Sequence, residues 1–297
     1  MYHNPVLLHE SVEGLNLRPN GTYVDVTFGG GGHSKHILSQ LENGHLFGFD
    51  QDQDAANNII ADDRFTFIPQ NFKYLKNFLL LHNQKEVDGI LADLGVSSHQ
   101  FDVATKGFSI RFDGDLDMRM DQNNPVKAAD IINAYSPEDL AKLFTNYGEL
   151  NNAYRIALSI VEARTSKPIQ TTTDLKEAIR KHLPFGKENK VLAQLFQAMR
   201  IEVNQEMQAL ESLLLQSIAV LKPGGRLVVI SYHSLEDRMV KNFMKSGKLS
   251  GEAEKDFFGN NLSPFKLISR KAIVPSEQEI NENNRARSAR LRIAEKK

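Results

Sequence analysis

The stretch that decides the fold is Thr22–His33, which reads TYVDVTFGGGGH. Its first half is rich in β-branched and aromatic residues, as in a buried strand, and its second half holds four consecutive glycines, Gly29–Gly32. A helical pattern follows, with Ile37, Leu38 and Leu41 on one face. The sequence therefore predicts a strand, a tight glycine turn and a helix, an arrangement in which the backbone can approach a ligand closely.

Strand-like and helix-like segments alternate on both sides of this unit. The Val87–Asp93 segment is almost wholly apolar, which is typical of a parallel strand covered on both faces. Alternation of this kind predicts an α/β fold with a doubly wound parallel sheet. The other expected strands are His45–Asp50, Phe65–Ile68 and Arg226–Tyr232, with a closing antiparallel pair at Lys266–Arg270 and Arg290–Ile293 that is joined by a loop-like segment.

The middle of the chain has a different, helical pattern. Ser136-Pro137-Glu138-Asp139 is a helix start, because it offers a capping serine, a proline at the first helical position and an acid three residues after the cap. Apolar residues at spacings of three and four continue over Glu188–Leu221, as in one long helix or two. We therefore expect an α/β domain of residues 1–104 and 204–297, interrupted by an inserted α-helical subdomain, residues 105–203.

The composition is that of an ordinary globular protein. The 297 residues include 36 Lys and Arg and 37 Asp and Glu, so any attraction to nucleic acid must come from local patches. The absence of cysteine excludes a disulfide framework, a thiolate metal site and a Cys nucleophile. Neither a signal peptide nor an apolar run of about 20 residues is visible, so we expect a cytoplasmic protein that does not enter a membrane.

Acidic residues at strand ends point to a cofactor that contains a nucleoside. Asp50 closes an expected strand about 20 residues after the glycine turn, where an acidic side chain accepts hydrogen bonds from ribose hydroxyls. A P-loop is disfavoured because Lys35 is not followed by Ser or Thr, and Ser34 makes the match to a dinucleotide fingerprint imperfect. S-adenosylmethionine carries a sulfonium charge and suits a pocket with carboxylates such as Asp25, Asp50 and Asp93.

Two loops follow expected strands and should face this cofactor. Asp93–Gln100 (DLGVSSHQ) offers a carboxylate and turned carbonyls for an exocyclic amine. In Ser231–Arg238 (SYHSLEDR), His233 could orient a base or relay a proton, and Tyr232 could stack on a base. Helix caps or turns are the structural alternatives for both loops. A Ser–His hydrolase is disfavoured because the chain has no G-x-S-x-G sequence.

The clearest basic patch is residues 285–297, which could grip phosphates or simply form a charged edge strand. Its six basic residues are Arg285, Arg287, Arg290, Arg292, Lys296 and Lys297. Two apparent metal motifs are dismissed. Asp113, Asp115 and Asp117 imitate an EF-hand start without its Gly and Glu, and His33 and His36 lack a third ligand, so we expect no metal.

Taken together, these segments resemble the ribosomal RNA small subunit methyltransferase H family, also called MraW. The matching stretches are His3–Glu10, Asp25–Ser34, Val87–Gln100, Gly107–Asp121, Phe196–Glu206, Ser231–Lys241 and Asn284–Arg292, in the same order and at the same spacing. Residues 189–195 (NKVLAQL) depart from the family's usual His-Pro-Ala-Thr-Arg-like run, and Tyr232 stands where the family usually has Phe.

The resemblance implies a class I, Rossmann-like S-adenosylmethionine-dependent methyltransferase with an inserted helical subdomain for RNA recognition. It implies transfer of a methyl group to the exocyclic N4 amine of a cytosine in the decoding region of 16S rRNA, with the small ribosomal subunit as partner. Its cofactor-binding residues, carried over by motif, are Gly31, Gly32, His33, Asp50, Phe72, Asp93 and Gln100. Phe72 enters only through the resemblance.

Three residues are catalytic candidates. We expect Asp93 and nearby loop carbonyls to accept hydrogen bonds from the cytosine amine, and Tyr232 and His233 to stack on or orient the base. A nicotinamide oxidoreductase and a non-catalytic ribosome-assembly binder remain as alternatives, and a monomer and a homodimer are both compatible with the sequence.

Overall fold

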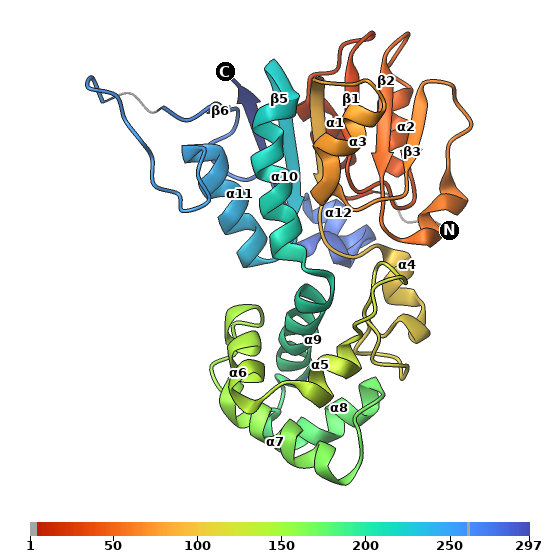
Figure 1. Cartoon of the computed structure of the whole chain (residues 1–297), viewed down its shortest axis with the longest axis vertical. Coiled ribbons are helices and arrows are strands. Elements are labelled where there is room, and N and C mark those ends of the chain that lie inside the picture. The colour runs from red at the N-terminus through yellow and green to blue at the C-terminus, as the bar shows by residue number, and fades with distance from the viewer. Residues whose placement is uncertain (1–4, 260–261) are drawn as a thin grey trace. The chain divides into compact units, whose positions relative to one another are not determined.

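In the computed structural model, which describes residues 5–259 and 262–297, the chain forms two compact units (Figure 1). The first unit combines Met1–Gly95 with Met207–Lys297, and the second is Val96–Glu206. The second unit, the insert, therefore begins earlier and ends slightly later than residues 105–203. His3 and Asn4, at the start of the matching stretch His3–Glu10, lie outside the described residues.

The first unit contains a seven-stranded sheet in the order β3-β2-β1-β4-β5-β7-β6. The first five strands of this order are parallel, and the last two join antiparallel, as the sequence predicts. Strand order reverses between β1 and β4, which makes this the topological switch point where ligands bind in such sheets. The strands are β1 Thr22–Asp25, β2 His45–Phe49, β3 Phe65–Ile68, β4 Val87–Asp93, β5 Leu221–Ser231, β6 Phe265–Leu267 and β7 Arg290–Lys296.

Two helical layers cover the sheet because successive strand residues point to opposite faces. Val24 and its same-face neighbours pack with Leu79 of α3 and Leu213 of α10 in one core cluster. Tyr23 and its neighbours pack with Leu15 of α1 and Ile37 of α2 in another. The helices of this unit are α1 Leu8–Leu15, α2 Gly32–Leu38, α3 Leu75–Leu81, α10 Glu206–Val220, α11 Ser234–Ser246 and α12 Glu277–Glu282, and η1 Gln53–Asn58, η2 Phe72–Tyr74 and η5 Asn284–Ser288 are 3-10 turns.

Two sequence expectations need correction or completion. The segment between β6 and β7 is not simply a loop, because it contains α12 and η5; Ser276 caps α12 by accepting a hydrogen bond from the Glu279 amide at 3.1 Å. The apolar run Glu188–Leu221 forms two helices rather than one, since Gln205 adopts a left-handed backbone with φ of 51° between them.

The second unit is helical (yellow to green in Figure 1) and has its own core. Its first capping signal works as predicted, because the Ser136 hydroxyl accepts a hydrogen bond from the Asp139 amide at 3.1 Å. Among its described residues the only β-type pairing is an isolated bridge between Asp115 and Thr171. Its helices are α4 Ser98–Asp102, α5 Ala128–Ala134, α6 Pro137–Asn146, α7 Ala153–Ser166, α8 Thr172–Ile179 and α9 Glu188–Asn204, with 3-10 turns η3 Ala104–Lys106 and η4 Arg180–His182.

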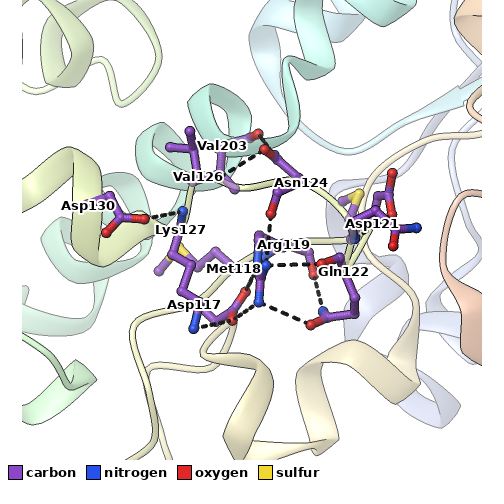
Figure 2. A network of polar contacts seen from close by, with 12 residues as sticks. Asp117, Met118, Arg119, Asp121, Gln122, Asn124, Val126, Lys127, Asp130 and Val203 are labelled. Carbon is purple, nitrogen blue, oxygen red and sulfur yellow. Dashed lines mark hydrogen bonds and ion pairs between the residues drawn. The ribbon is translucent and has the colours of Figure 1, made fainter.

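An arginine organises the long loop that leads into α5 (Figure 2). The Arg119 guanidinium binds the Asp117 carboxylate through two bonds of 2.8 Å, and its Nη1 donates to the carbonyls of Gln122 at 3.1 Å and Asn124 at 2.8 Å. Burial alone would raise the pKa of Asp117, but these bonds and the charge of Lys127 lower it. The aspartates that imitate an EF-hand thus belong in part to an internal ion-pair network.

The same loop is tied to the end of α9. The Asn204 side-chain amide donates to the Met118 carbonyl at 2.7 Å and accepts from the Met120 amide at 2.8 Å. Met118 is buried with a left-handed φ of 60°, so these bonds hold a backbone conformation that a methionine rarely adopts. The contacts give the Gly107–Asp121 stretch a structural role in the insert.

No helix in the part of the chain that the structure describes is long and apolar enough to span a membrane.

Candidate active site

Carboxylates gather where three neighbouring parallel strands end. Asp25 is the last residue of β1, Asp93 is the last residue of β4, and Asp50 directly follows β2. Tyr232 follows β5, the next strand beyond β4. Because the carboxyl ends of parallel strands meet at one edge of a sheet, the predicted acidic residues lie on the same edge, beside the switch point.

Asp25 ties the glycine turn to the sheet. It is fully buried, and its Oδ2 accepts a hydrogen bond from the Ser34 hydroxyl at 2.7 Å while Oδ1 accepts from the Thr27 amide at 3.1 Å. The Thr27 hydroxyl in turn accepts a hydrogen bond from the Asp93 amide at 2.7 Å. Burial raises the pKa of Asp25. Ser34, which makes the match to a dinucleotide fingerprint imperfect, thus donates a hydrogen bond to a buried carboxyl group.

The glycine turn has the backbone that only glycine adopts freely. Gly29 and Gly31 have φ of 50° and 74°, and Gly31 is the residue that precedes α2. A side chain at Gly32 would place its Cβ 2.2 Å from Cγ of Pro5, so this position needs glycine for packing. A Cβ at Gly29 would meet only the Thr27 carbonyl oxygen, at 3.8 Å, so the backbone there borders open space.

Asp50 joins the end of β2 to this turn. Its Oδ2 accepts a hydrogen bond from the Gly29 amide at 2.7 Å, and its Oδ1 accepts from the Asp52 amide at 2.8 Å. Burial raises the pKa of Asp50 to about 6, against the opposing effect of these two bonds. Each carboxylate oxygen retains acceptor capacity, so the group can still receive hydrogen bonds from a diol.

Asp93 is held by a contact that sequence reasoning missed. The Tyr232 hydroxyl donates to Asp93 Oδ1 at 2.7 Å, and Nδ1 of His33 lies 3.9 Å from Oδ2. Burial raises the pKa of Asp93 to about 6, although His33 and the Tyr232 hydrogen bond oppose the rise. The pKa of Tyr232 is raised well above 10 by burial and by Asp93, so its hydroxyl remains a donor. The expected stacking of Tyr232 on a base remains a prediction.

His233 occupies the N-cap of α11, which is the structural alternative for this residue. Its Nδ1 accepts a hydrogen bond from the Glu236 amide at 3.4 Å, and its Nε2 lies 3.2 Å from Glu236 Oε1. The Glu236 carboxylate also accepts from the Tyr232 amide at 2.9 Å. The pair therefore fixes the backbone that carries Tyr232, and proton relay by His233 remains a prediction.

Two further residues are carried over from the resemblance. Phe72 opens the turn after β3 and is packed, half-buried, against the core on the α3 side of the sheet. Gln100 is buried in α4 of the second unit, where its side-chain oxygen accepts from the Ser97 amide at 3.1 Å. Contact of either residue with a cofactor remains a prediction.

The basic patch divides into two parts. Arg292 is 12% exposed and grips the Asp237 carboxylate of α11 through bonds of 2.7 and 3.1 Å, so it is a structural residue. Arg290 lies 3.8 Å from the same carboxylate. Arg285 and Arg287 are exposed. Only the exposed residues can meet phosphates in the way that the sequence suggests.

Comparison with known proteins identifies the chain's relatives. The family model described as "MraW methylase family" matches residues 1–297. The ribosomal RNA small subunit methyltransferase H of Flavobacterium johnsoniae is 60% identical over 296 residues, covering 99% of this chain and 98% of the relative. The protein of the same name from Bacteroides thetaiotaomicron is 59% identical over 297 residues, covering 100% and 98%.

Likeness to solved structures is weak. A rRNA methylase from Streptococcus thermophilus aligns over 98% of this chain and 97% of its own, with 13% identity and a TM-score of 0.42. A putative methyltransferase from Streptococcus mutans, in complex with SAH, aligns over the same fractions with 14% identity and a TM-score of 0.42. Assignment thus depends on the family model and the close relatives, and by both the chain belongs to the MraW methylase family.

Proposed function

We propose that this methylase transfers a methyl group from S-adenosylmethionine to the exocyclic N4 amine of a cytosine in the decoding region of 16S rRNA. The observation that carries the proposal is the partly buried Asp93 carboxylate, held by the Tyr232 hydroxyl at the switch point beside the glycine turn. The family of the chain and the names of relatives near 60% identity support the reaction and the substrate. A nicotinamide oxidoreductase, the alternative that uses a similar glycine turn, does not agree with membership of a methylase family.

The residues at this edge fit S-adenosylmethionine. Asp50 can accept hydrogen bonds from the ribose hydroxyls, and the open space beside Gly29 admits a ligand close to the backbone. Asp93 would supply negative charge for the cationic sulfonium and ammonium groups. Two carboxylates with a pKa of about 6 are mostly ionised at neutral pH, and binding of a cation would ionise them further. The bound donor supplies a methyl group activated by its positive sulfur.

The chain's own residues would act mainly by placement. The cytosine N4 lone pair is delocalised into the ring, and acceptors on the amine hydrogens favour a localised lone pair. Asp93 and carbonyls of the loop that follows it are the acceptors in this proposal, and Asp93 is ionised at neutral pH to fulfil that role. N4 would gain the methyl group as the methyl–sulfur bond breaks, and it would release one proton to water. Aligned reactants can reach effective molarities of about 10⁵–10⁸ M.

The RNA must present the cytosine unstacked, which is easiest in a single-stranded or irregular region. We propose that the helical insert and the exposed arginines Arg285 and Arg287 hold the surrounding RNA. The small ribosomal subunit is then the partner, and the cytoplasm is where the two would meet.

Transfer of labelled methyl groups tests this proposal. Small subunits that lack the modification are incubated with S-adenosylmethionine carrying a labelled methyl group and either the wild-type protein, Asp93→Asn or Asp63→Asn. The wild type and the exposed-residue control Asp63→Asn should label the 16S rRNA equally, and Asp93→Asn should lose at least about 100-fold in rate. Unlabelled RNA with the wild type would refute the reaction, and near-normal turnover by Asp93→Asn would remove Asp93 from catalysis.

A further inference from the structure

The chain turns sharply between η4 and α9. The Lys187 amide donates a hydrogen bond to the Pro184 carbonyl at 3.0 Å, and Gly186 has a left-handed φ of 73°. A glycine with positive φ at the third position is typical of a tight four-residue turn. Phe185 stands at the corner of this turn. The geometry is therefore set by Gly186 and leaves the preceding side chain directed away from the helices.

Phe185 is 100% exposed, and a Cβ at Gly186 would meet no atom within 4 Å. The other strongly exposed phenylalanines of the described chain, Phe257 and Phe258, at least contact each other, with ring centroids 5.6 Å apart. Phe185 has no such aromatic neighbour in the described chain. A large apolar ring left wholly in water at the tip of an ordered turn has no folding role.

Basic side chains surround this ring. Residues 176–190 carry five basic residues against two acidic ones, although the whole chain has a net charge of -1. Arg180, Lys181, Lys187 and Lys190 are exposed on the two flanks of the turn. Arg180 lies 3.4 Å from Glu177 and Lys181 lies 3.3 Å from Glu162, but exposed ion pairs of this kind are weak. Within the described residues, Lys187 and Lys190 form no ion pair.

The base of the turn is anchored and lies in a positive field. Nε2 of His182 lies 2.6 Å from the Ser159 hydroxyl, which fixes η4 against α7. The pKa of His182 is lowered by burial and by the charges of Lys181 and Arg155, so Arg155 of α7 adds to the positive charge on this side. Ile179 and Leu192 are buried on either side of the turn. The ring is thus presented from a fixed support.

We propose that this turn is an RNA-binding site, in which Phe185 stacks on an unpaired base and the flanking Arg180, Lys181, Lys187 and Lys190 bind the adjacent phosphates. An exposed aromatic ring between cations is the chemistry that recognises single-stranded RNA, because every base offers a face for stacking and every linkage a negative charge. The inference rests on the proposed function, since that function makes RNA the substrate. It adds which surface of the insert holds that RNA.

Binding of a fluorescent single-stranded RNA from the decoding region, measured by anisotropy over a range of salt, tests the site. Phe185→Ala should weaken binding about ten-fold with an unchanged salt slope, and Phe185→Trp should restore it. The salt slope is the slope of log affinity against log salt concentration. The double variant Lys187→Ala/Lys190→Ala should reduce its magnitude by about 1.4, because each lost phosphate contact removes about 0.7. The matched control Phe257→Ala removes a 98% exposed ring from the first unit and should change nothing.

Folding and cofactor binding are checked separately. Because Phe185 is fully exposed, Phe185→Ala should keep the melting temperature and the S-adenosylmethionine affinity of the wild type. Wild-type affinity of Phe185→Ala for the RNA would overturn the inference. Reduced methylation of subunits with unchanged RNA affinity would also overturn it, since the turn would then contact a protein. If the wild type binds the RNA through Phe185 but transfers no methyl group, the proposed function fails and the RNA site stands.

Discussion

The hydrogen bond from Tyr232 to Asp93 can be removed with a single oxygen atom, by Tyr232→Phe. The bond is 2.7 Å long and its acceptor is a partly buried carboxylate. A hydrogen bond to a charged group contributes about 1.5–3 kcal/mol, and 1.36 kcal/mol corresponds to one pKa unit. The pKa of Asp93, about 6 in the wild type, should therefore rise by roughly 1–2 units in the variant.

This rise has a defined consequence for cofactor binding. At pH 7 a carboxyl group with a pKa of about 6 is about 90% ionised, whereas one with a pKa of roughly 7.5 is about 25% ionised. If the donor binds the ionised form, Tyr232→Phe should bind S-adenosylmethionine about four-fold more weakly at pH 7. The two proteins should converge above about pH 9, where both carboxyl groups are ionised.

The contribution of Asp93 to folding stability should decrease as pH rises, whereas cofactor affinity should increase. Asp93 holds its proton more tightly in the folded protein than in the unfolded chain, where the ordinary pKa is 3.8. The stabilisation that this proton gives is present below pH 3.8 and is lost as pH rises to about 6; in Tyr232→Phe the loss should extend to roughly pH 7.5.

Calorimetric titration with S-adenosylmethionine from pH 5 to 9 measures the change in affinity. NMR titration of carboxyl-labelled aspartate measures the change in the pKa of Asp93. The matched control is Tyr135→Phe, which removes a 2.8 Å tyrosine–carboxylate bond to Glu202 in the insert and should leave the Asp93 titration unchanged. An Asp93 midpoint that is the same in Tyr232→Phe and the wild type would refute the reasoning.

Three further predictions concern the Arg119 network, the glycine turn and the basic patch. Arg119→Ala should lower the free energy of unfolding of the insert by about 3 kcal/mol in urea titration, because it removes both hydrogen bonds to the Asp117 carboxylate and leaves only the more distant Lys127. The exposed-residue control Arg111→Ala should cost less than about 0.5 kcal/mol, and equal effects would contradict the network's role. Gly31→Ala should destabilise the protein by about 1–2 kcal/mol, because residue 31 has a positive φ, and should weaken S-adenosylmethionine binding in calorimetry. Unchanged stability and binding would mean that the turn tolerates a side chain. Arg292→Ala should lower the melting temperature with little effect on the salt slope of RNA binding. Arg287→Ala should leave the melting temperature unchanged and lower the magnitude of that slope by about 0.7, and the reverse pattern would exchange the roles of the two arginines.

The sheet and the acidic edge could be predicted because local patterns determine them. Phe65–Ile68 and Val87–Asp93 are strands with the bounds that the sequence predicts, since each is a short apolar or β-branched run. The first strand is expected to continue to Phe28 but ends at Asp25, because the side chain and amide of Thr27 turn toward Asp25 as the chain leaves the sheet. Alternation of strands with helices makes the strands parallel, so their carboxyl ends lie at one edge of the sheet. This brings the acidic residues together without any knowledge of distances.

Contacts between distant segments could not be predicted from local patterns. Tyr232 and Asp93 are 139 residues apart, and only the register of β4 beside β5 brings the hydroxyl to the carboxylate. The pairing of Arg292 with Asp237 likewise requires that α11 and β7 be neighbours. The break at Gln205 carries neither glycine nor proline, so it gives no local signal.

The identity of the methylated nucleoside tests the central claim most directly. The 16S rRNA of subunits treated with the wild-type protein and labelled S-adenosylmethionine is digested and analysed by nucleoside mass spectrometry, with fragment mapping to locate the label. The proposed function predicts that the label is in N4-methylcytidine and lies in the decoding region. Label on a ring carbon of cytosine, on another nucleoside or outside that region would contradict it.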